Sequence, residues 1–155
     1  MTPPKFLTDE MLGKLTRWLR LCGYDALYAK GKGWGDNEIL LEAHDSKRVL
    51  LTRDVALAQK SKRIARCVLL GSIYVEGQLG EVVKALGLSP PKAPTPRHCT
   101  ECNALVKDAG IEEVEKSVPY SVRSPARQFW KCTKCGKVYW VGAHWKRIQG
   151  VLESL

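Results

Sequence analysis

The sequence predicts an α/β fold in which a parallel sheet flanked by helices is followed by a small cysteine-rich module. Two observations lead to this prediction. Short apolar runs alternate with segments of helical period through residues 1–90, which is the pattern of a parallel sheet with helices on its faces. Beyond a proline-rich stretch, the remaining residues contain two CxxC motifs.

The predicted elements of the first part follow in strand–helix order. The first strand is at residues 6–7, and the helix after it, residues 10–23, ends at Gly23. The apolar face of this helix is expected to consist of Met11, Leu12, Leu15, Trp18, Leu19 and Cys22. Further strands are expected at 25–29, 48–52 and 66–72, and further helices at 36–46, 54–63 and 76–87.

A proline-rich segment divides the chain. Pro90, Pro91, Pro94 and Pro96 disfavour a helix and favour an extended spacer. We therefore expect an α/β domain at residues 1–90, a linker at 91–97 and a cysteine-containing domain at 98–155.

The charge balance of the chain is basic. Its 155 residues carry 25 Lys and Arg against 16 Asp and Glu, a formal charge of +9. This excess favours nucleic acid or another polyanion as a partner, although a basic protein without such a partner is the alternative. No apolar run approaches the roughly 20 residues of a membrane span, and the N-terminus lacks a signal-peptide segment. We therefore expect a cytoplasmic protein with no membrane contact, in which cysteines are reduced or bind metal.

Three aspartates stand at the predicted ends of strands or starts of helices. Asp9 and Asp54 each follow a predicted strand, and Asp36 precedes the second helix after a glycine-rich loop. In an open parallel sheet all strand-to-helix turns lie at one edge, so these carboxylates are expected to converge there. Helix capping is the alternative for each one alone. Together they would repel each other unless neutralised, and an oxygen ligand set of this kind suits Mg²⁺ or Mn²⁺.

Two basic residues lie near this edge on the first helix. Lys14 and Arg17 are three positions apart on its polar face, close to Asp9, and are candidates for holding a phosphate backbone. A solvated helix face is the alternative interpretation. Glu38 is either an outer metal ligand or a favourable charge in the first turn of its helix.

The cysteine motifs predict a zinc ribbon. Cys99 and Cys102 form one CxxC pair, and Cys132 and Cys135 form the other. Two such pairs in a cytoplasmic chain are typical of a tetrahedral Zn²⁺ site, whereas disulfides and redox motifs are the competing interpretations. Four thiolates leave no open position for catalytic water, so the zinc is expected to be structural. The long segment between the pairs is expected to form a hairpin or an extended arm.

The C-terminal stretch, residues 137–155, predicts a strand followed by a helix. It mixes aromatic and basic residues, which suits single-stranded RNA: Tyr139, Trp140, His144, Trp145, Lys146 and Arg147. Trp145 is therefore a candidate for substrate binding. The alternative is that the tryptophans dock this module onto the first domain.

These motifs together resemble a known family. "FLTDEMLGKLTRWLRLCGYDALY", "DNEIL", "LLTRD" and the CxxC pairs with "CGKVYWVGAHW" look like the RNase-domain family named for the C-terminus of the Mut-seven exonucleases. That family belongs to the PIN-like nucleases and carries an appended zinc ribbon. The resemblance implies metal-dependent RNA cleavage and assigns Asp9, Asp36 and Asp54 to the acidic cluster.

Two functions follow from the resemblance and the residues. In the first, the chain is a ribonuclease in which Asp9, Asp36 and Asp54 bind Mg²⁺ or Mn²⁺ and Lys14 and Arg17 hold the phosphate. Many PIN-like nucleases carry a further acid after the third or fourth strand, but here the fourth strand exits through Gly71 and Ser72. The second function is therefore a non-catalytic RNA- or ribosome-binding module with this fold. The expected partner in both is RNA, with tRNA and rRNA among the candidates, and no protein partner is indicated.

Overall fold

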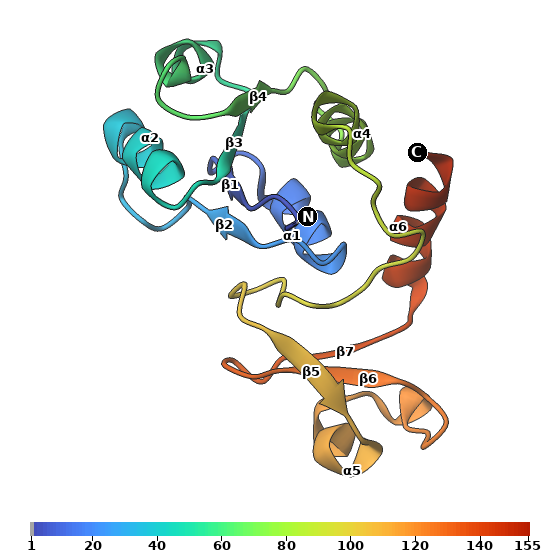
Figure 1. Cartoon of the computed structure of the whole chain (residues 1–155). Coiled ribbons are helices and arrows are strands. Elements are labelled where there is room, and N and C mark those ends of the chain that lie inside the picture. Colours follow the sequence, from blue (N-terminus) through green and yellow to red (C-terminus); the bar gives the residue numbers. More distant parts are fainter. Residues whose placement is uncertain (1) are drawn as a thin grey trace.

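Two sheets organise the chain in the computed structural model, which describes residues 2–155 (Figure 1). The first sheet has four parallel strands in the order β2-β1-β3-β4. These strands are β1 (Phe6–Thr8), β2 (Ala26–Tyr28), β3 (Val49–Thr52) and β4 (Cys67–Leu69). The helices between and after them are α1 (Gly13–Leu21), α2 (Asp36–Asp45), α3 (Val55–Ser61) and α4 (Val75–Leu86). The prediction of a parallel sheet flanked by helices is therefore confirmed.

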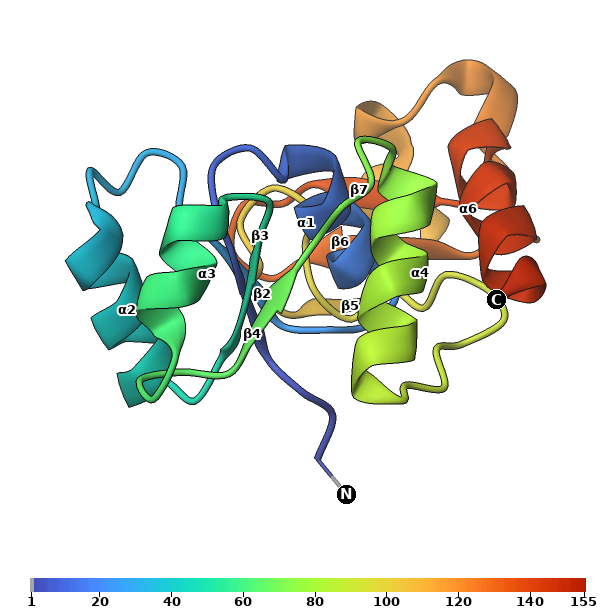
Figure 2. The same ribbon diagram turned by 90° about the horizontal axis from the view of Figure 1, so that it is seen from above.

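The parallel sheet is covered on both faces. Helices α2 and α3 lie on one side of the sheet and α1 and α4 on the other (Figure 2). Leu7 and Leu50 belong to the buried cluster with α2 and α3, whereas Phe6 and Leu51 belong to the cluster with α1 and α4. Every residue of β1 and β3 is buried, as expected for central strands of a sheet with two covered faces.

The first helix is shorter than the sequence pattern predicted. Gly23 follows α1 with φ of +90°, a left-handed conformation that glycine adopts without strain, so the predicted stop is correct. The helix begins only at Gly13, however, and Met11 lies in the turn before it. Met11 is 70% exposed, so its expected place on the apolar face was wrong.

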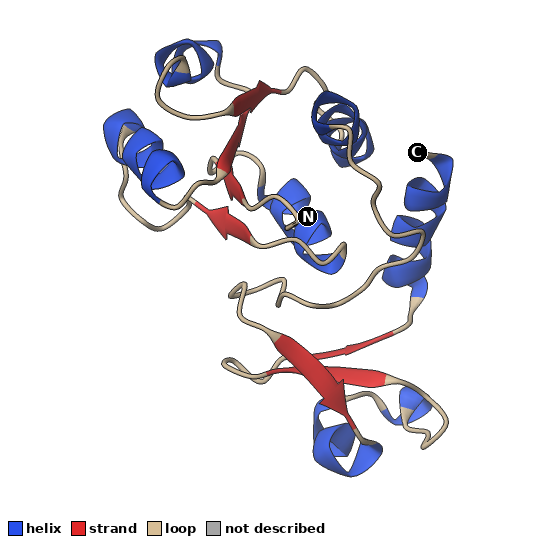
Figure 3. Cartoon of the chain, viewed as in Figure 1, coloured by secondary structure: helices blue, strands red, loops and turns tan. Residues whose placement is uncertain are grey.

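The C-terminal part contains the second sheet and a final helix. Strands β5 (Val106–Ala109), β6 (Phe129–Cys132) and β7 (Val138–Trp140) pair antiparallel, and α6 (Ala143–Ser154) follows them (Figure 3). The predicted strand and helix in residues 137–155 are thus confirmed. The segment between the cysteine pairs forms a hairpin of β5 and β6. Its connection contains three short helical turns: α5 (Ile111–Val114), η1 (Glu115–Ser117) and η2 (Tyr120–Val122).

The two parts share a core. Helix α6 lies beside α4 (Figure 1), and one buried cluster contains Leu79 and Val82 of α4 together with Ile148 and Leu152 of α6. The segment between α4 and β5 contacts the C-terminal end of α1: the Thr95 amide donates a hydrogen bond to the Leu21 carbonyl at 2.7 Å. Unfolding of either part would therefore expose apolar surface of the other.

A buried arginine connects α1 to the cysteine-containing segment. Arg20 is only 5% exposed; its Nε donates to the Ala26 carbonyl at 2.9 Å and its Nη1 to the Thr100 carbonyl at 2.7 Å. Burial lowers the pKa of Arg20, and charge on Cys99 and Cys102 acts in the opposite direction. The guanidinium is therefore placed to compensate negative charge on the cysteines.

A second polar connection joins β2 to the same segment. Asp25 accepts hydrogen bonds from Arg48 Nη1 at 2.6 Å and from Asn103 Nδ2 at 2.7 Å. The Asn103 side-chain oxygen accepts from the Ala26 amide at 3.2 Å. Asn103 has φ of +66°, a left-handed conformation in which asparagine is more common than most other residues. One carboxylate thus holds an arginine of the first part and an asparagine of the second.

Replacement of Arg20 should destabilise the whole chain. Arg20→Met removes two hydrogen bonds from a charged donor and leaves the buried Thr100 carbonyl unpaired, at an expected cost of about 2–4 kcal/mol. Arg17→Met, the matched change on the exposed face of α1, should cost less than about 0.5 kcal/mol. Urea unfolding followed by circular dichroism measures both. Equal urea midpoints for the two variants would contradict the role of Arg20.

The contribution of Asp25 should depend on pH. Burial acts to raise the pKa of Asp25, but hydrogen bonds from Arg48 and Asn103 outweigh it and lower the pKa below its usual value. A lowered folded-state pKa gives stability that is present above the unfolded pKa and lost as the pH falls through the folded pKa. Asp25→Asn should therefore lower the free energy of unfolding by about 1–2 kcal/mol at pH 7, and by less below about pH 4. A deficit unchanged between pH 7 and pH 3 in urea titrations would refute this account.

Candidate functional site

Three aspartates meet at the carboxyl edge of the parallel sheet. Asp9 follows β1, Asp54 follows β3, and Asp36 is the first residue of α2. All three line one cleft of about 310 Å³, together with Trp34 from the glycine-rich loop. The structure thus gathers at one edge the acids that the strand–helix order predicted there.

Asp9 is the buried member of this group. Its side chain is 7% exposed, and Oδ1 accepts a hydrogen bond from the Met11 amide at 3.0 Å. Oδ2 accepts from the Thr52 hydroxyl, which in turn accepts from the Asp54 amide at 3.0 Å. No lysine, arginine or histidine among residues 2–155 forms an ion pair with Asp9. Because α1 begins at Gly13, Asp9 is not the cap of that helix.

The other two aspartates differ in their contacts. Asp54 is the N-cap of α3 and accepts from the Leu57 amide at 3.1 Å, so the capping alternative holds for this residue. Asp36 does not cap α2, because Gly35 occupies that position. Its Oδ2 instead accepts from Lys60 Nζ at 2.9 Å, and this hydrogen bond and charge raise the pKa of Lys60.

Glu38 has a structural role at the start of α2. Its carboxylate accepts from the Gly35 amide at 2.9 Å, as the glutamate of a capping box does. Of the two interpretations left open by the sequence, this contact favours the role at the helix start over that of an outer metal ligand.

The three aspartates offer carboxylate oxygens, which are suitable ligands for a hard divalent cation, but their ligand atoms are not close together. Carboxylate oxygens are the ligands that Mg²⁺ and Mn²⁺ prefer, and Mg²⁺ commonly binds through one or two carboxylates and several waters. Within residues 2–155, the three aspartates do not form a group whose ligand atoms all lie within 4.8 Å of one another. The Thr52 hydroxyl links the Asp9 carboxylate to the Asp54 backbone amide and so connects the ends of β1 and β3.

A basic cleft adjoins the acidic one. Lys14 and Arg17 are exposed on α1 and line a second cleft of about 600 Å³, which Lys30 also lines. This cleft shares Glu10 and Met11 with the acidic cleft. The basic cleft and the acidic cleft are therefore neighbours on the surface.

An additional acid lies at the end of β4, but it comes from helix α4 and not from the loop that follows the strand. Glu81 of α4 accepts hydrogen bonds from the Gly71 amide at 2.8 Å and the Ser72 amide at 2.9 Å. Both its oxygens are engaged by backbone, and Glu81 does not line the acidic cleft. No acid that follows β4 in the chain supplements the three aspartates.

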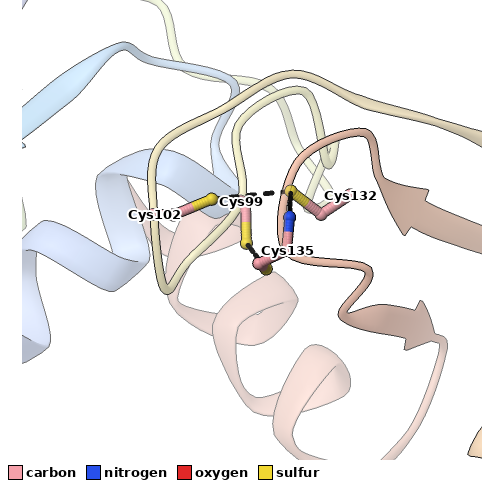
Figure 4. Close-up of side chains that lie close together, drawn as sticks. All are labelled: Cys99, Cys102, Cys132 and Cys135. Carbon is pink, nitrogen blue, oxygen red and sulfur yellow. Dashed lines mark hydrogen bonds between the residues drawn. The ribbon is translucent and has the colours of Figure 1, made fainter.

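The four cysteines form a compact cluster (Figure 4). The Sγ atoms of Cys99, Cys102, Cys132 and Cys135 all lie within 4.8 Å of one another. Two of the separations are 3.6 and 3.5 Å. A tetrahedral ion with sulfur ligands at about 2.3 Å requires sulfur separations of about 3.8 Å, so this set could hold a structural metal such as zinc.

Backbone and side-chain donors surround the cluster. The amides of Lys134 and Cys135 each donate to Cys132 Sγ at 3.4 Å. Although burial acts in the opposite direction, these hydrogen bonds lower the pKa of Cys132 to about 6, which favours the thiolate that binds metal. The hydroxyl of Tyr139 lies 3.0 Å from Cys99 Sγ and accepts from the Thr100 amide at 2.9 Å. Neither Tyr139 nor Thr100 has a sequence pattern that would have predicted this role.

Trp145 contributes to packing. Its ring is 8% exposed and stacks on Trp130, with centroids 5.0 Å apart and planes inclined by 16°. Part of the side chain also lines a cavity between α1 and the C-terminal part. The stack lies within the C-terminal part, so it shows that Trp145 packs there and does not decide between docking onto the first domain and substrate binding.

The parallel sheet with its acidic cleft and the separate cysteine cluster define the class of protein: an α/β domain followed by a four-cysteine module that could hold a metal. Comparison with family models extends this: the chain matches the Mut7-C RNAse domain family over residues 4–152 and belongs to that family. Membership indicates a nuclease-like role with RNA as substrate. Comparisons with curated proteins and with solved structures gave no match. In residues 2–155 no helix is long and apolar enough to span a bilayer.

Loss of the cysteine cluster should weaken the whole chain. The protein is expected to contain one zinc ion per chain by elemental analysis, and Cys132→Ser should remove it. Because the two parts share a core, the variant should unfold at a lower temperature in a single transition. Cys67→Ser, a change in a half-buried thiol outside the cluster, should retain the zinc. A wild-type protein that folds without bound metal would contradict the assignment.

Proposed function

We propose that the protein is a Mg²⁺- or Mn²⁺-dependent ribonuclease that cleaves RNA phosphodiester bonds in the cleft lined by Asp9, Asp36 and Asp54. The proposal includes a PIN-like nuclease domain at residues 1–90, a linker at 91–97 and a structural zinc ribbon at 98–155. Family membership supports the reaction class, and the acidic cleft supports the location.

The buried carboxylate of Asp9 carries the proposal. An ionised group with 7% exposure and no cationic partner is unfavourable unless hydrogen bonds or an ion compensate its charge. Among residues 2–155 two donors reach it, one on each oxygen, so each oxygen keeps acceptor capacity that no described residue fills. A divalent cation would satisfy this need, and a residue serving only as a helix cap would not require it.

The residues of the cleft have distinct proposed roles. When bound, the metal supplies an activated water and charge at the leaving oxygen. Asp9 and Asp54 would hold it. Thr52 and the Met11 amide orient the Asp9 carboxylate. The Leu57 amide orients the Asp54 carboxylate. Asp36 would bind the ion or orient the attacking water, because its ion pair with Lys60 is exposed and weak enough to exchange. Lys14 and Arg17 hold the substrate phosphate from the adjoining cleft.

The second candidate function is a non-catalytic RNA- or ribosome-binding module. Two contacts favour it: Lys60 occupies the Asp36 carboxylate, and Glu81 at the β4 exit is engaged by backbone amides. In this function the basic cleft would bind RNA and the acids would only hold helix α3 and the turn after β1. The two candidate functions predict different results when an aspartate of the cleft is replaced by asparagine. RNA cleavage would be lost only if the protein is a nuclease, whereas RNA binding would be retained in both cases.

Asp54→Asn separates the two functions most cleanly. Asparagine caps a helix about as well as aspartate, so the variant should keep the Leu57 contact and the stability of the wild type. It removes an anionic metal ligand, and cleavage of a labelled single-stranded RNA with Mn²⁺ should fall at least about 100-fold. RNA affinity should change by less than about 5-fold, because the phosphate contacts remain.

The matched control is Asp45→Asn, at the exposed end of α2 outside the cleft. It should cleave RNA at the wild-type rate. Cleavage by Asp54→Asn at the wild-type rate would exclude the acidic cleft as the active site. Absence of cleavage by pure wild type at millimolar Mn²⁺, with RNA binding retained, would favour the binding module.

A further inference from the structure

A cavity lies between α1 and the C-terminal part. Its volume is about 480 Å³, and its walls come from three regions of the chain: α1, the loop after Cys99, and the segment from β7 into α6. Trp140, Tyr139 and Trp145 contribute aromatic surface, and Leu21 contributes an aliphatic wall. This size and lining suit a planar organic group, with a few polar atoms to orient it.

Polar and cationic side chains border the cavity. Arg17 contributes from α1, Lys137 from the turn before β7 and His144 from α6. Lys137 pairs with Glu101 at 3.0 Å, whereas Arg17 forms no ion pair among residues 2–155. A guanidinium without an ion pair in the lining of an aromatic cavity suits a ligand in which a planar ring is attached to a phosphate.

The cavity adjoins the basic cleft, which in turn adjoins the proposed active site. The basic cleft shares Glu10 and Met11 with the acidic cleft, and it shares Arg17 with the cavity. A strand bound along α1 would thus pass from the carboxylates over Lys14 to Arg17. Lys14 and Arg17 lie about 4.5 Å apart along the helix axis, since each residue rises about 1.5 Å.

We propose that this cavity binds a nucleobase of a single-stranded RNA whose backbone lies along α1. This inference rests on the proposed function and names the substrate class: RNA with an unpaired base beside the cleaved phosphate. The base lies against Trp140, with the adjoining phosphate on Arg17. An RNA duplex keeps its bases stacked and paired and therefore cannot fill the cavity without opening.

Rigidity of the aromatic wall favours this occupant. Trp145 is held by its stack on Trp130, and Tyr139 is held by hydrogen bonds to Thr100. A base entering the cavity would thus meet surfaces that are already ordered, which reduces the entropy lost on binding. Trp140 is half-buried, packs on the cluster that contains Phe129 and Val138, and is also one of the lining residues of the cavity.

The test measures RNA binding in the Asp54→Asn background, in which the strand should stay intact. A fluorescently labelled single-stranded oligonucleotide is titrated by anisotropy against that protein with and without Trp140→Leu. Loss of one base–aromatic contact should weaken binding about 10-fold or more. Tyr120→Leu is the matched control, because Tyr120 is an aromatic of the same part that is 85% exposed and outside the cavity. It should change affinity less than about 2-fold.

A second variant covers the case in which Trp140→Leu fails to fold. Ala143 is exposed and lines the cavity, so Ala143→Phe should fill it at little cost in stability and weaken binding similarly. An oligonucleotide containing 4-thiouridine, irradiated and analysed by mass spectrometry, should crosslink within residues 137–145. Affinity equal to that of Tyr120→Leu for both cavity variants, or crosslinks only elsewhere, would overturn the inference.

The outcomes also separate the inference from the proposed function. If wild type cleaves RNA while both cavity variants bind and cleave as well as wild type, the nuclease function stands and the base cavity is wrong. If wild type cleaves nothing while binding depends on Trp140 and crosslinks map to the cavity, the inference stands and the ribonuclease function is wrong.

Discussion

The arrangement of the chain depends on the buried guanidinium of Arg20. It joins the inner face of α1, the start of β2 and the loop that carries the first two cysteines, through hydrogen bonds to Ala26 and Thr100. A buried cation is costly unless its donors are satisfied and its charge is compensated, and the neighbouring cysteines supply negative charge when ionised. Through this contact the cysteine cluster fixes the position of α1, the helix that also carries Lys14 and Arg17.

The same constraint relates the three surface features along α1. The acidic cleft lies at the N-terminal side of the helix, the basic cleft beside its first turns and the aromatic cavity at Arg17. Because the two parts share a core, these features cannot shift independently without opening buried apolar surface. A structural metal remote from the acids would thereby affect the geometry with which RNA meets them, without taking part in the reaction.

Much of the fold could be predicted from local patterns. Alternation of apolar runs with helical periods gave the parallel sheet, and the parallel strand ends brought Asp9, Asp36 and Asp54 to one cleft. CxxC spacing predicted the cluster. Contacts between distant side chains left no such pattern: the Arg20 connection, the Thr52 bridge and the pairing of Lys60 with Asp36 each depend on the assembled fold. Met11 shows a different kind of error. The apolar period of α1 is correct, but it was extended to Met11, which lies before the helix begins at Gly13 and is exposed.

The central claim, that the acidic cleft holds a divalent cation, is tested most directly by crystals grown in millimolar Mn²⁺. Anomalous difference maps collected on either side of the manganese edge distinguish manganese from zinc. The account predicts a manganese peak at coordinating distance from carboxylate oxygens of Asp9 and Asp54, and a separate zinc peak among Cys99, Cys102, Cys132 and Cys135. A well-occupied zinc peak in a map with no manganese at the aspartates would contradict it.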